Sequence, residues 1–300
     1  MEVKQKLLFI FNPNAGKKRV GSHLLRILDL LTQSGYVVTA YPTQGPEDAM
    51  RAALEWGGQY DRVICCGGDG TLNETVRGML QGKHTVPIGY IPAGSTNDFA
   101  SSLGLPKQME EATRIAAKGE PFRCDAGTLN GNYFVYVAAF GAFAEVSYST
   151  SQQAKNLLGH LAYLLEGMSR LPKLKSHRVR VEYDDQVLED EFIVGMVTNS
   201  LSVGGFKGLC GTDVRLNDGQ FEALFIKQPK HVGQWSKLIS AVLRQDLNSE
   251  FLRSIRASSL QFSAEEPISW TIDGEFGGTF AQANVVNYRE MLQIVAPEQD

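Results

Sequence analysis

One stretch of this sequence constrains the fold more than any other. A short apolar segment at residues 63–66 runs directly into Gly-Gly-Asp-Gly-Thr at residues 67–71, and a helical pattern follows. Glycines at this density let the backbone approach a bulky anion, and the N–H groups that begin a helix can point at phosphate oxygens. Asp69 adds a carboxylate, which favours a divalent cation beside the phosphate. The stretch predicts a phosphate-binding loop, although a tight strand-to-helix turn would explain the glycines alone.

The two common glycine-rich nucleotide motifs are both absent. A Walker loop ending at Gly16-Lys17 would need a glycine where the sequence has Phe11. The dinucleotide fingerprint GxGxxG would need a third glycine at the position of Asn73. The loop at residues 67–71 therefore belongs to another class of phosphate site.

Composition limits the class of protein. A chain of 300 residues suggests about two domains, and 43% hydrophobic with 21% charged residues is typical of a soluble globular protein. The net charge of −4 argues against a nucleic-acid binder, which usually carries a basic surface. The four cysteines show no CxxC spacing, and the apolar run at residues 7–11 is too short for a signal peptide. We therefore expect a cytoplasmic protein with free thiols.

The first part of the sequence alternates between strand and helix patterns. Strand patterns occur at residues 7–11, 36–41, 63–66 and 86–91. Helical patterns alternate with them, from the predicted N-cap Ser22 to Gly35 and at residues 46–56, 71–81 and 107–118. Such alternation predicts an α/β domain with a parallel sheet, and these sheets bind ligands beyond the carboxyl ends of their strands. Four polar loops should converge at that edge: residues 12–16, Thr43, residues 67–73 and residues 94–98.

The second part of the sequence has the pattern of an antiparallel, β-rich domain. Two hairpins are predicted, at residues 122–140 and 177–198, with helices at residues 155–169 and 232–243 and further strands at residues 221–227, 258–262, 268–272, 278–286 and 291–295. We place the domains at residues 1–122 and 123–300, with about the last 15 residues as a candidate to pack back on the first domain.

Acidic residues of the second half are candidates for chemistry. They are Asp125, Asp213, Asp218, and Glu275 in the sequence Asp273-Gly274-Glu275. Taken singly, each is most simply explained as turn chemistry, because aspartate and glycine favour tight turns. Only their occurrence together with the loops of the first half favours a catalytic role.

Six motifs in a fixed order resemble a known family. They are NPNAG at residues 12–16, GGDGTLNETV at 67–76, PAGSTNDFA at 92–100, CDAG at 124–127, NDGQFE at 217–222 and IDGE at 272–275. Together they resemble the bacterial soluble diacylglycerol kinase and related lipid kinase family, which shares its catalytic domain with sphingosine kinases. The resemblance covers nearly the whole chain, although residues 94–96 read Gly-Ser-Thr where many relatives have Gly-Thr-Gly.

The resemblance implies roles for particular residues. It implies a nucleotide-binding domain and a sandwich-like β domain, with Asp69, Asp125 and the general base Glu275 as catalytic residues. A structural Mg²⁺ would be held by the Asp218 side chain and the carbonyls of Arg215 and Gln220. ATP would contact Asn12, Pro13, Asn14, Ala15, Gly16, Thr43, Gly67, Gly68, Asp69, Gly70, Thr71, Leu72, Asn73 and Thr96.

The predicted function is an ATP- and Mg²⁺-dependent lipid kinase that phosphorylates diacylglycerol or a similar lipid at the inner membrane surface. Two alternatives stay open: an NAD kinase, which shares GGDGT, and an inactive nucleotide- or lipid-binding regulator. A homodimer is the default assembly.

Two segments are candidates for contact with the lipid. The apolar residues 134–143 could line an acyl-chain pocket, but strand core explains them more simply. The basic run of Arg170, Lys173, Lys175, His177, Arg178 and Arg180 could bind anionic headgroups, but a solvated face is the simpler explanation.

Overall fold

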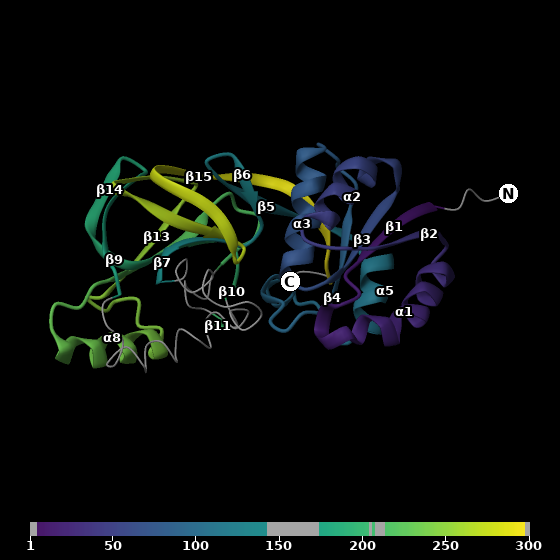
Figure 1. Cartoon of the computed structure of the whole chain (residues 1–300), viewed down its shortest axis with the longest axis horizontal. Coiled ribbons are helices and arrows are strands. Elements are labelled where there is room, and N and C mark those ends of the chain that lie inside the picture. The colour runs from purple at the N-terminus through teal and green to yellow at the C-terminus, as the bar shows by residue number, and fades with distance from the viewer. Residues whose placement is uncertain (1–4, 143–173, 204–205, 208–213, 298–300) are drawn as a thin grey trace. The chain divides into compact units, whose positions relative to one another are not determined.

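The computed structural model describes residues 5–142, 174–203, 206–207 and 214–297 of the chain. It divides into two compact units, one formed by Met1–Cys124 with Glu290–Asp300 and the other by Asp125–Arg289 (Figure 1). The C-terminal residues thus belong to the same unit as the N-terminal half. We describe each unit by itself.

The first unit is built on parallel strands. In the order β2-β1-β3-β4, each strand is hydrogen-bonded in parallel to the next, and Ile294 and Val295 of β15 pair in parallel with the other side of β4. The elements are β1 (Gln5–Phe11), α1 (Ala15–Gln33), β2 (Tyr36–Pro42), α2 (Asp48–Trp56), η1 (Gly57–Gln59), β3 (Arg62–Gly67), α3 (Asp69–Gln81), β4 (Ile88–Pro92), α4 (Asp98–Ser102) and α5 (Met109–Lys118).

Both faces of this sheet are buried because helices cover each of them. Figure 1 shows α1 and α5 together on one face and α2 and α3 on the other. Along β1, Leu7 and Phe9 belong to the core under α1 and α5. The alternate residues Leu8 and Ile10 are completely buried as well. Continuous apolar strands are what a sheet covered on both faces requires.

The prediction that Ser22 caps a helix was wrong. Helix α1 already begins at Ala15, and the Ser22 hydroxyl lies inside it and donates to the Arg19 carbonyl at 2.8 Å. The earlier start follows from Asn12, whose side chain accepts the Asn14 N–H at 2.9 Å and whose carbonyl accepts the Ala15 N–H at 3.1 Å. This turn begins the helix before its apolar pattern becomes visible in the sequence.

The second unit consists mainly of antiparallel strands. Strand β9 pairs with β7, β8 and β12, and β14 pairs with β7, β8 and β15, so that β7, β9, β8 and β14 form a closed circuit. Its elements include β6 (Asn132–Phe134), β7 (Val137–Gly141), β8 (His177–Tyr183), β9 (Gln186–Thr198), β10 (Ser202–Val203), β11 (Phe206–Lys207), β12 (Phe221–Lys227), α8 (Val232–Arg244), β13 (Leu252–Ala257) and β14 (Ser259–Ile272). Strands β5 (Pro121–Leu129) and β15 (Glu275–Val295) contribute residues to both units.

An aromatic cluster fills the circuit of strands in this unit. The Trp270 ring lies 4.9 Å from the ring centroids of both Phe140 and Phe262, and all three side chains are buried. Phe134 is also fully buried in this core. In the described part of residues 134–143, strand core is therefore the correct interpretation of the apolar pattern.

Three strand predictions in this half need correction. The predicted strand 133–140 is broken between β6 and β7, because the N–H groups of Val135, Tyr136 and Val137 bind the Asp273 carboxylate instead of a neighbouring strand. The strands predicted at 258–262 and 268–272 are one strand, β14, with a register shift between Ser263 and Ile268. Those predicted at 278–286 and 291–295 are one strand, β15. The predicted helix at residues 155–169 and Asp213 lie outside the described residues.

Candidate active site

The polar loops of the first unit meet at the carboxyl ends of its strands. The Asn12 N–H donates to the Cys66 carbonyl at 2.9 Å, and the Ala93 N–H donates to the Gly67 carbonyl at 2.7 Å. The Thr43 N–H donates to the Phe11 carbonyl at 2.9 Å. Backbone hydrogen bonds therefore join the loops that the sequence analysis grouped, from Asn12–Gly16 through Thr43 to Gly67–Asn73 and the loop containing Thr96.

Glycines allow these loops to lie in direct contact. A Cβ atom on Gly16 would lie 2.3 Å from the Ala93 carbonyl oxygen, and Gly16 has a φ of +58°. A Cβ atom on Gly94 would lie 2.6 Å from the Gly68 Cα atom. Side chains would push the loops apart, so the glycines allow the close backbone approach that phosphate-binding loops require.

Asn97 shapes the loop that follows β4. It adopts the left-handed conformation with φ 54°, its Oδ1 accepts the Gly94 N–H at 2.8 Å, and its Nδ2 donates to the Gly94 carbonyl at 3.0 Å. The side chain thus closes the loop from Gly94 to Asn97, which contains Thr96. It also aims the first N–H groups of α4 toward Asp69.

Asp69 is the first residue of α3 and has the most strongly perturbed carboxylate of this unit. Burial and the nearby charge of Asp98 raise its pKa to about 6, although hydrogen bonds from the N–H groups of Asn97, Asp98 and Phe99 act in the opposite direction. Its Oδ1 atom is buried and has no hydrogen-bond partner. Two close carboxylates and an unpaired oxygen fit a divalent cation, which takes oxygen ligands and would offset their repulsion.

Asn73 lies one helical turn after Asp69, on the same face of α3. It is 1% exposed, and neither its Oδ1 nor its Nδ2 atom has a hydrogen-bond partner. Buried amides are normally paired, so these two atoms provide donor and acceptor capacity for a ligand. The predicted ATP loop therefore ends on a side chain with unused hydrogen-bonding groups.

Glu74 is a site-forming residue that the sequence analysis missed. Its carboxylate accepts the N–H groups of Glu47 at 2.8 Å and Ala49 at 3.1 Å, which are the N-terminal groups of α2. Helix N-termini present unpaired donors, and a carboxylate from a neighbouring helix satisfies them. Glu74 thus ties α3 to the segment that follows Thr43. Its place inside the GGDGTLNET motif was the only available signal.

Asp48 secures the other side of that segment. It is 3% exposed, and its carboxylate accepts the Gln44 N–H at 2.8 Å and the Tyr41 hydroxyl at 3.0 Å. Burial alone would raise the pKa of Asp48, but these hydrogen bonds and the Arg51 guanidinium lower it. The Thr43 loop is therefore anchored by two carboxylates, one from α2 and one from α3.

In the second unit, Asp125 and the segment around Asp218 come together. Asp125 is fully buried, its carboxylate accepts the Gly219 N–H at 2.7 Å, and its own N–H donates to the Leu216 carbonyl at 2.7 Å. Asn199 donates through Nδ2 to the Asp125 carbonyl at 3.2 Å. The predicted second acid and the predicted metal loop thus form one hydrogen-bonded group.

The loop around Asp218 fits a metal only in part. Its carboxylate and the carbonyls of Arg215 and Gln220 are oxygen ligands of the type that Mg²⁺ prefers. However, Asp218 Oδ1 accepts the Gln220 N–H at 2.9 Å, and Oδ2 forms an ion pair with Arg256. The Gln220 carbonyl accepts the Asn287 Nδ2 at 3.2 Å. Within the described ranges no three His, Cys, Asp or Glu side chains form a metal cluster. A cation here would have to displace Arg256.

Glu275 follows directly after a tight turn. Asp273 and Gly274 have φ values of 49° and 84°, and Ile272 pairs with Glu275 across the turn between β14 and β15. Glu275 is exposed, in contrast to the buried Asp273 beside it. Asp69 and Glu275 belong to different units, so their common role in one reaction is part of the proposal below.

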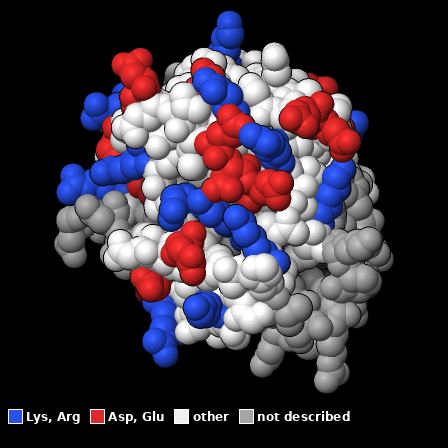
Figure 2. Space-filling view, turned by 90° about the vertical axis from the view of Figure 1, so that its left-hand side faces the viewer, with Lys and Arg blue, Asp and Glu red and all other residues white. Residues whose placement is uncertain are grey.

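The described part of the basic run is neutralised by acidic partners. Lys175 pairs with Glu266 at 2.9 Å, Arg178 with Glu189 at 2.9 Å, and Arg180 with Glu182 at 2.8 Å. Figure 2 shows Lys and Arg side chains interleaved with Asp and Glu on this end of the molecule. Arg170 and Lys173 lie outside the described residues. The face is therefore a ladder of exposed ion pairs and offers no uniform positive charge.

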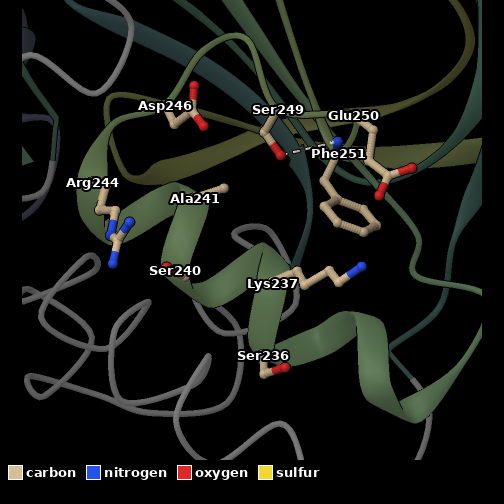
Figure 3. A pocket seen from close by; sticks show the side chains of 9 residues that line it. All are labelled: Ser236, Lys237, Ser240, Ala241, Arg244, Asp246, Ser249, Glu250 and Phe251. Atoms are coloured by element: carbon tan, nitrogen blue, oxygen red, sulfur yellow. Dashed lines mark hydrogen bonds between the residues drawn. The ribbon is translucent and has the colours of Figure 1, made fainter.

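A separate hollow of about 490 Å³ lies between α8 and the loop that leads to β13 (Figure 3). Its lining mixes the cations Lys237 and Arg244 with the anions Asp246 and Glu250. None of the residues predicted from the sequence lines it. The hollow is distinct from the loops described above.

Comparison with known proteins defines the class first. Residues 6–129 match the model of the diacylglycerol kinase catalytic domain, and residues 136–296 match that of the YegS C-terminal NAD kinase beta sandwich-like domain. These matches define a two-domain kinase with a sandwich-like C-terminal domain.

Full-length relatives then give the family. The chain is 33% identical to a diacylglycerol kinase of Bacillus subtilis (strain 168) over 97% of this chain and 96% of that protein. It is also 33% identical to a diacylglycerol kinase of Staphylococcus carnosus (strain TM300), over 99% of this chain and 96% of that protein. A crystal structure from Bacillus anthracis str. Sterne superposes with a TM-score of 0.85 at 25% identity, covering 99% of this chain and 97% of that one. The chain belongs to the diacylglycerol kinase family, and the resemblance drawn from the six motifs is confirmed.

Proposed function

We propose that this protein transfers the γ-phosphate of ATP to a hydroxyl group of diacylglycerol or a similar lipid. The observation that supports this most strongly is the full-length match to diacylglycerol kinases at 33% identity. The candidate carboxylates Asp69, Asp125 and Glu275 are all present, which argues against an inactive regulator. The family match disfavours the NAD kinase alternative.

In this proposal the first unit binds the nucleotide. The glycine-rich loop around Gly68 and Gly70 receives the phosphates, and Asn73 supplies a buried donor and acceptor. Asp69, assisted by Asp98, would hold Mg²⁺, which would supply positive charge to neutralise the phosphates. The unpaired Oδ1 atom of Asp69 supports that assignment.

The second unit provides the groups that act on the lipid hydroxyl. Glu275 takes the hydroxyl proton, the hydroxyl oxygen forms a bond to the γ-phosphorus, and the bond from that phosphorus to the β-γ bridging oxygen breaks to release ADP. Asp125 contributes by holding the loop of residues 216–219 through its carboxylate and N–H groups. Exposure of Glu275 is consistent with its access to a substrate hydroxyl.

A structural Mg²⁺ at Asp218, with the carbonyls of Arg215 and Gln220, is a further part of the proposal. The observed ion pair between Asp218 and Arg256 places a resident cation at the same carboxylate. Binding of Mg²⁺ would therefore require the Arg256 guanidinium to move. The second site is thus expected to bind Mg²⁺ in competition with this arginine.

The acceptor lipid implies work at a membrane surface, and we propose peripheral association with the inner face of the membrane from the cytoplasm. In the described ranges, none of the helices has the length and apolarity needed to cross a bilayer. Since exposed cations at residues 175–180 are paired, the described basic run is not the basis of this association. A homodimer is the proposed assembly.

A panel of acceptors tests the proposed function. Purified protein is incubated with radiolabelled ATP and Mg²⁺, and offered detergent-solubilised diacylglycerol, a total lipid extract, or NAD. We expect label in phosphatidic acid, or in another phosphorylated lipid from the extract. Label only in NADP would contradict the lipid assignment. Binding of ATP without transfer to any acceptor would favour the regulator.

A further inference from the structure

A buried carboxylate lies two residues before the proposed base. Asp273 is 4% exposed, and its Oδ2 accepts the Val135 N–H at 2.7 Å. Its Oδ1 accepts the N–H groups of Tyr136 at 2.9 Å and Val137 at 3.0 Å, and its own N–H donates to the Val137 carbonyl at 2.8 Å. Three successive backbone N–H groups surrounding a carboxylate form a charge-assisted clamp.

A tight turn does not need this clamp. The hairpin between β8 and β9 turns through Asp184 and Asp185, whose φ values of 43° and 60° resemble those of Asp273 and Gly274. Both side chains of that turn are exposed. Formation of the hairpin therefore does not explain why Asp273 is buried, and its carboxylate must serve the segment it binds or the residue it precedes.

The clamped segment is itself part of a continuous network. The Tyr136 carbonyl accepts the Thr198 hydroxyl at 2.6 Å and the Asn199 N–H at 3.0 Å, and Asn199 donates to the Asp125 carbonyl at 3.2 Å. Asp125 in turn binds Gly219. Hydrogen bonds thus run from the turn that presents Glu275 to the acid and loop on the other side of this unit.

We propose that Asp273 is a positioning residue for Glu275. It fixes the turn between β14 and β15 to the segment of residues 135–137, so that the base is held in a constant relation to Asp125. This inference rests on the proposed function, in which Glu275 takes the proton of the lipid hydroxyl. Positioning matters because a displacement of about 1 Å can cost on the order of 10²-fold in rate.

Asp273→Asn tests the proposal with little change in side-chain volume. The amide keeps one acceptor oxygen but turns an NH₂ group toward N–H donors, so the clamp loses at least one bond. We expect kcat to fall on the order of 10²-fold while KM for ATP stays unchanged. Asp185→Asn, an exposed turn aspartate of the same unit, should leave both constants unchanged. Phe225→Leu, in the buried core, should lower Tm without lowering kcat of the folded enzyme.

A double-mutant cycle separates positioning from a merely structural role. If Asp273 acts through Glu275, then Asp273→Asn has no further effect in the Glu275→Gln background, because the group it positions is already absent. The inference would be overturned if Asp273→Asn lowered kcat by the same factor in the wild-type and Glu275→Gln backgrounds. It would also be overturned if Phe225→Leu, at the same loss of Tm, lowered kcat as much as Asp273→Asn does. Full turnover of Glu275→Gln would instead overturn the role of Glu275 as the base in the proposed function, and absence of lipid phosphorylation by the wild type would overturn the proposed function itself. The two failures are therefore distinguishable.

Discussion

Asp69 in the first unit differs from Asp125 and Asp273 in the second in how its carboxylate oxygens are paired. In the first unit, Asp69 keeps a buried oxygen without a partner, and Asn73 keeps two unpaired polar atoms. In the second unit, Asp125 and Asp273 direct their oxygens at backbone N–H groups of their own chain. Buried polar groups cost free energy unless they are paired, so a ligand that pairs with Asp69 and Asn73 would stabilise the first unit.

This difference indicates which unit we expect to bind the nucleotide and which we expect to position the base. In the proposed function, a phosphate and a cation would complete the unpaired atoms of Asp69 and Asn73 beside the loops around Gly68 and Gly94. In the second unit the backbone N–H bonds of Asp273 hold the turn that carries the exposed Glu275. The division predicts that changes in the first unit affect nucleotide and metal binding. Changes in the second unit should affect turnover.

Among changes in the first unit, the largest expected effect is that of Asp69→Asn on activity. Loss of this carboxylate should lower the rate about 10²- to 10⁴-fold, because charge neutralisation at the phosphates is the main part of phosphoryl-transfer catalysis. Steady-state transfer at several Mg²⁺ concentrations measures the loss. Recovery of the wild-type rate at high Mg²⁺ would contradict a direct role.

The same variant should be more stable than the wild type at alkaline pH. Because the pKa of Asp69 is raised from 3.8 to about 6 in the folded protein, the stability linked to its protonation is complete below about pH 4 and is lost as pH rises through 6. Asp69→Asn removes this dependence, so its advantage in Tm should shrink as the pH falls. Thermal melts without nucleotide or metal measure the difference, and an equal advantage at all pH values would contradict the raised pKa.

A smaller effect is expected at Gly16. A Cβ atom would meet the Ala93 carbonyl oxygen at 2.3 Å, and the residue has a φ of +58°. Gly16→Ala should therefore destabilise the protein by about 1–3 kcal/mol and weaken ATP binding. Gly21→Ala is the matched control in the same helix, where nothing lies within 4 Å, and should stabilise by about 0.5–1 kcal/mol. Equal effects of the two changes on ATP affinity would contradict close packing of the loops.

A moderate effect on Tm is expected from changes at the proposed second metal site. Asp218→Ala should lower Tm by a few degrees, corresponding to about 1 kcal/mol, and abolish any rise of Tm with Mg²⁺. Arg256→Ala removes the competing cation and should strengthen that rise. A wild-type Tm and activity that do not change with Mg²⁺ concentration, once the catalytic site is saturated, would remove the site from the account.

The smallest effect is expected on the face with paired charges. Arg178→Ala removes one exposed ion pair with Glu189 and should leave the Tm nearly unchanged, because exposed ion pairs contribute little to stability. Binding to vesicles that contain anionic lipid should also remain unchanged. A clear loss of vesicle binding would show that this face contacts the membrane despite its acidic partners.

Local patterns predicted much of the first unit. Continuous apolar strands followed by glycine-rich loops indicated where Asn12, Thr43 and Gly67 would lie, and backbone hydrogen bonds join those segments. The start of α1 was mispredicted because its first turn is set by the Asn12 side chain and carbonyl, which precede any apolar repeat. Such turns depend on a few specific bonds and not on periodicity.

The second unit was harder to predict because its contacts are long-range. Nothing near Val135 in the sequence shows that its N–H group binds Asp273, which lies 138 residues away. The Arg256 partner of Asp218 is likewise distant in the sequence. The acids themselves were found through their motifs, but the sequence does not separate Asp273, which holds the backbone, from Glu275, which is exposed.

The most direct test of the account compares the wild type with Glu275→Gln in two assays on the same preparations. One measures transfer of labelled phosphate from ATP to diacylglycerol, and the other measures the Kd for ATP with Mg²⁺. The account predicts that transfer falls about 10²- to 10⁴-fold while the Kd stays unchanged, since the proposed base lies outside the unit proposed to bind the nucleotide. Retained transfer by Glu275→Gln would contradict it.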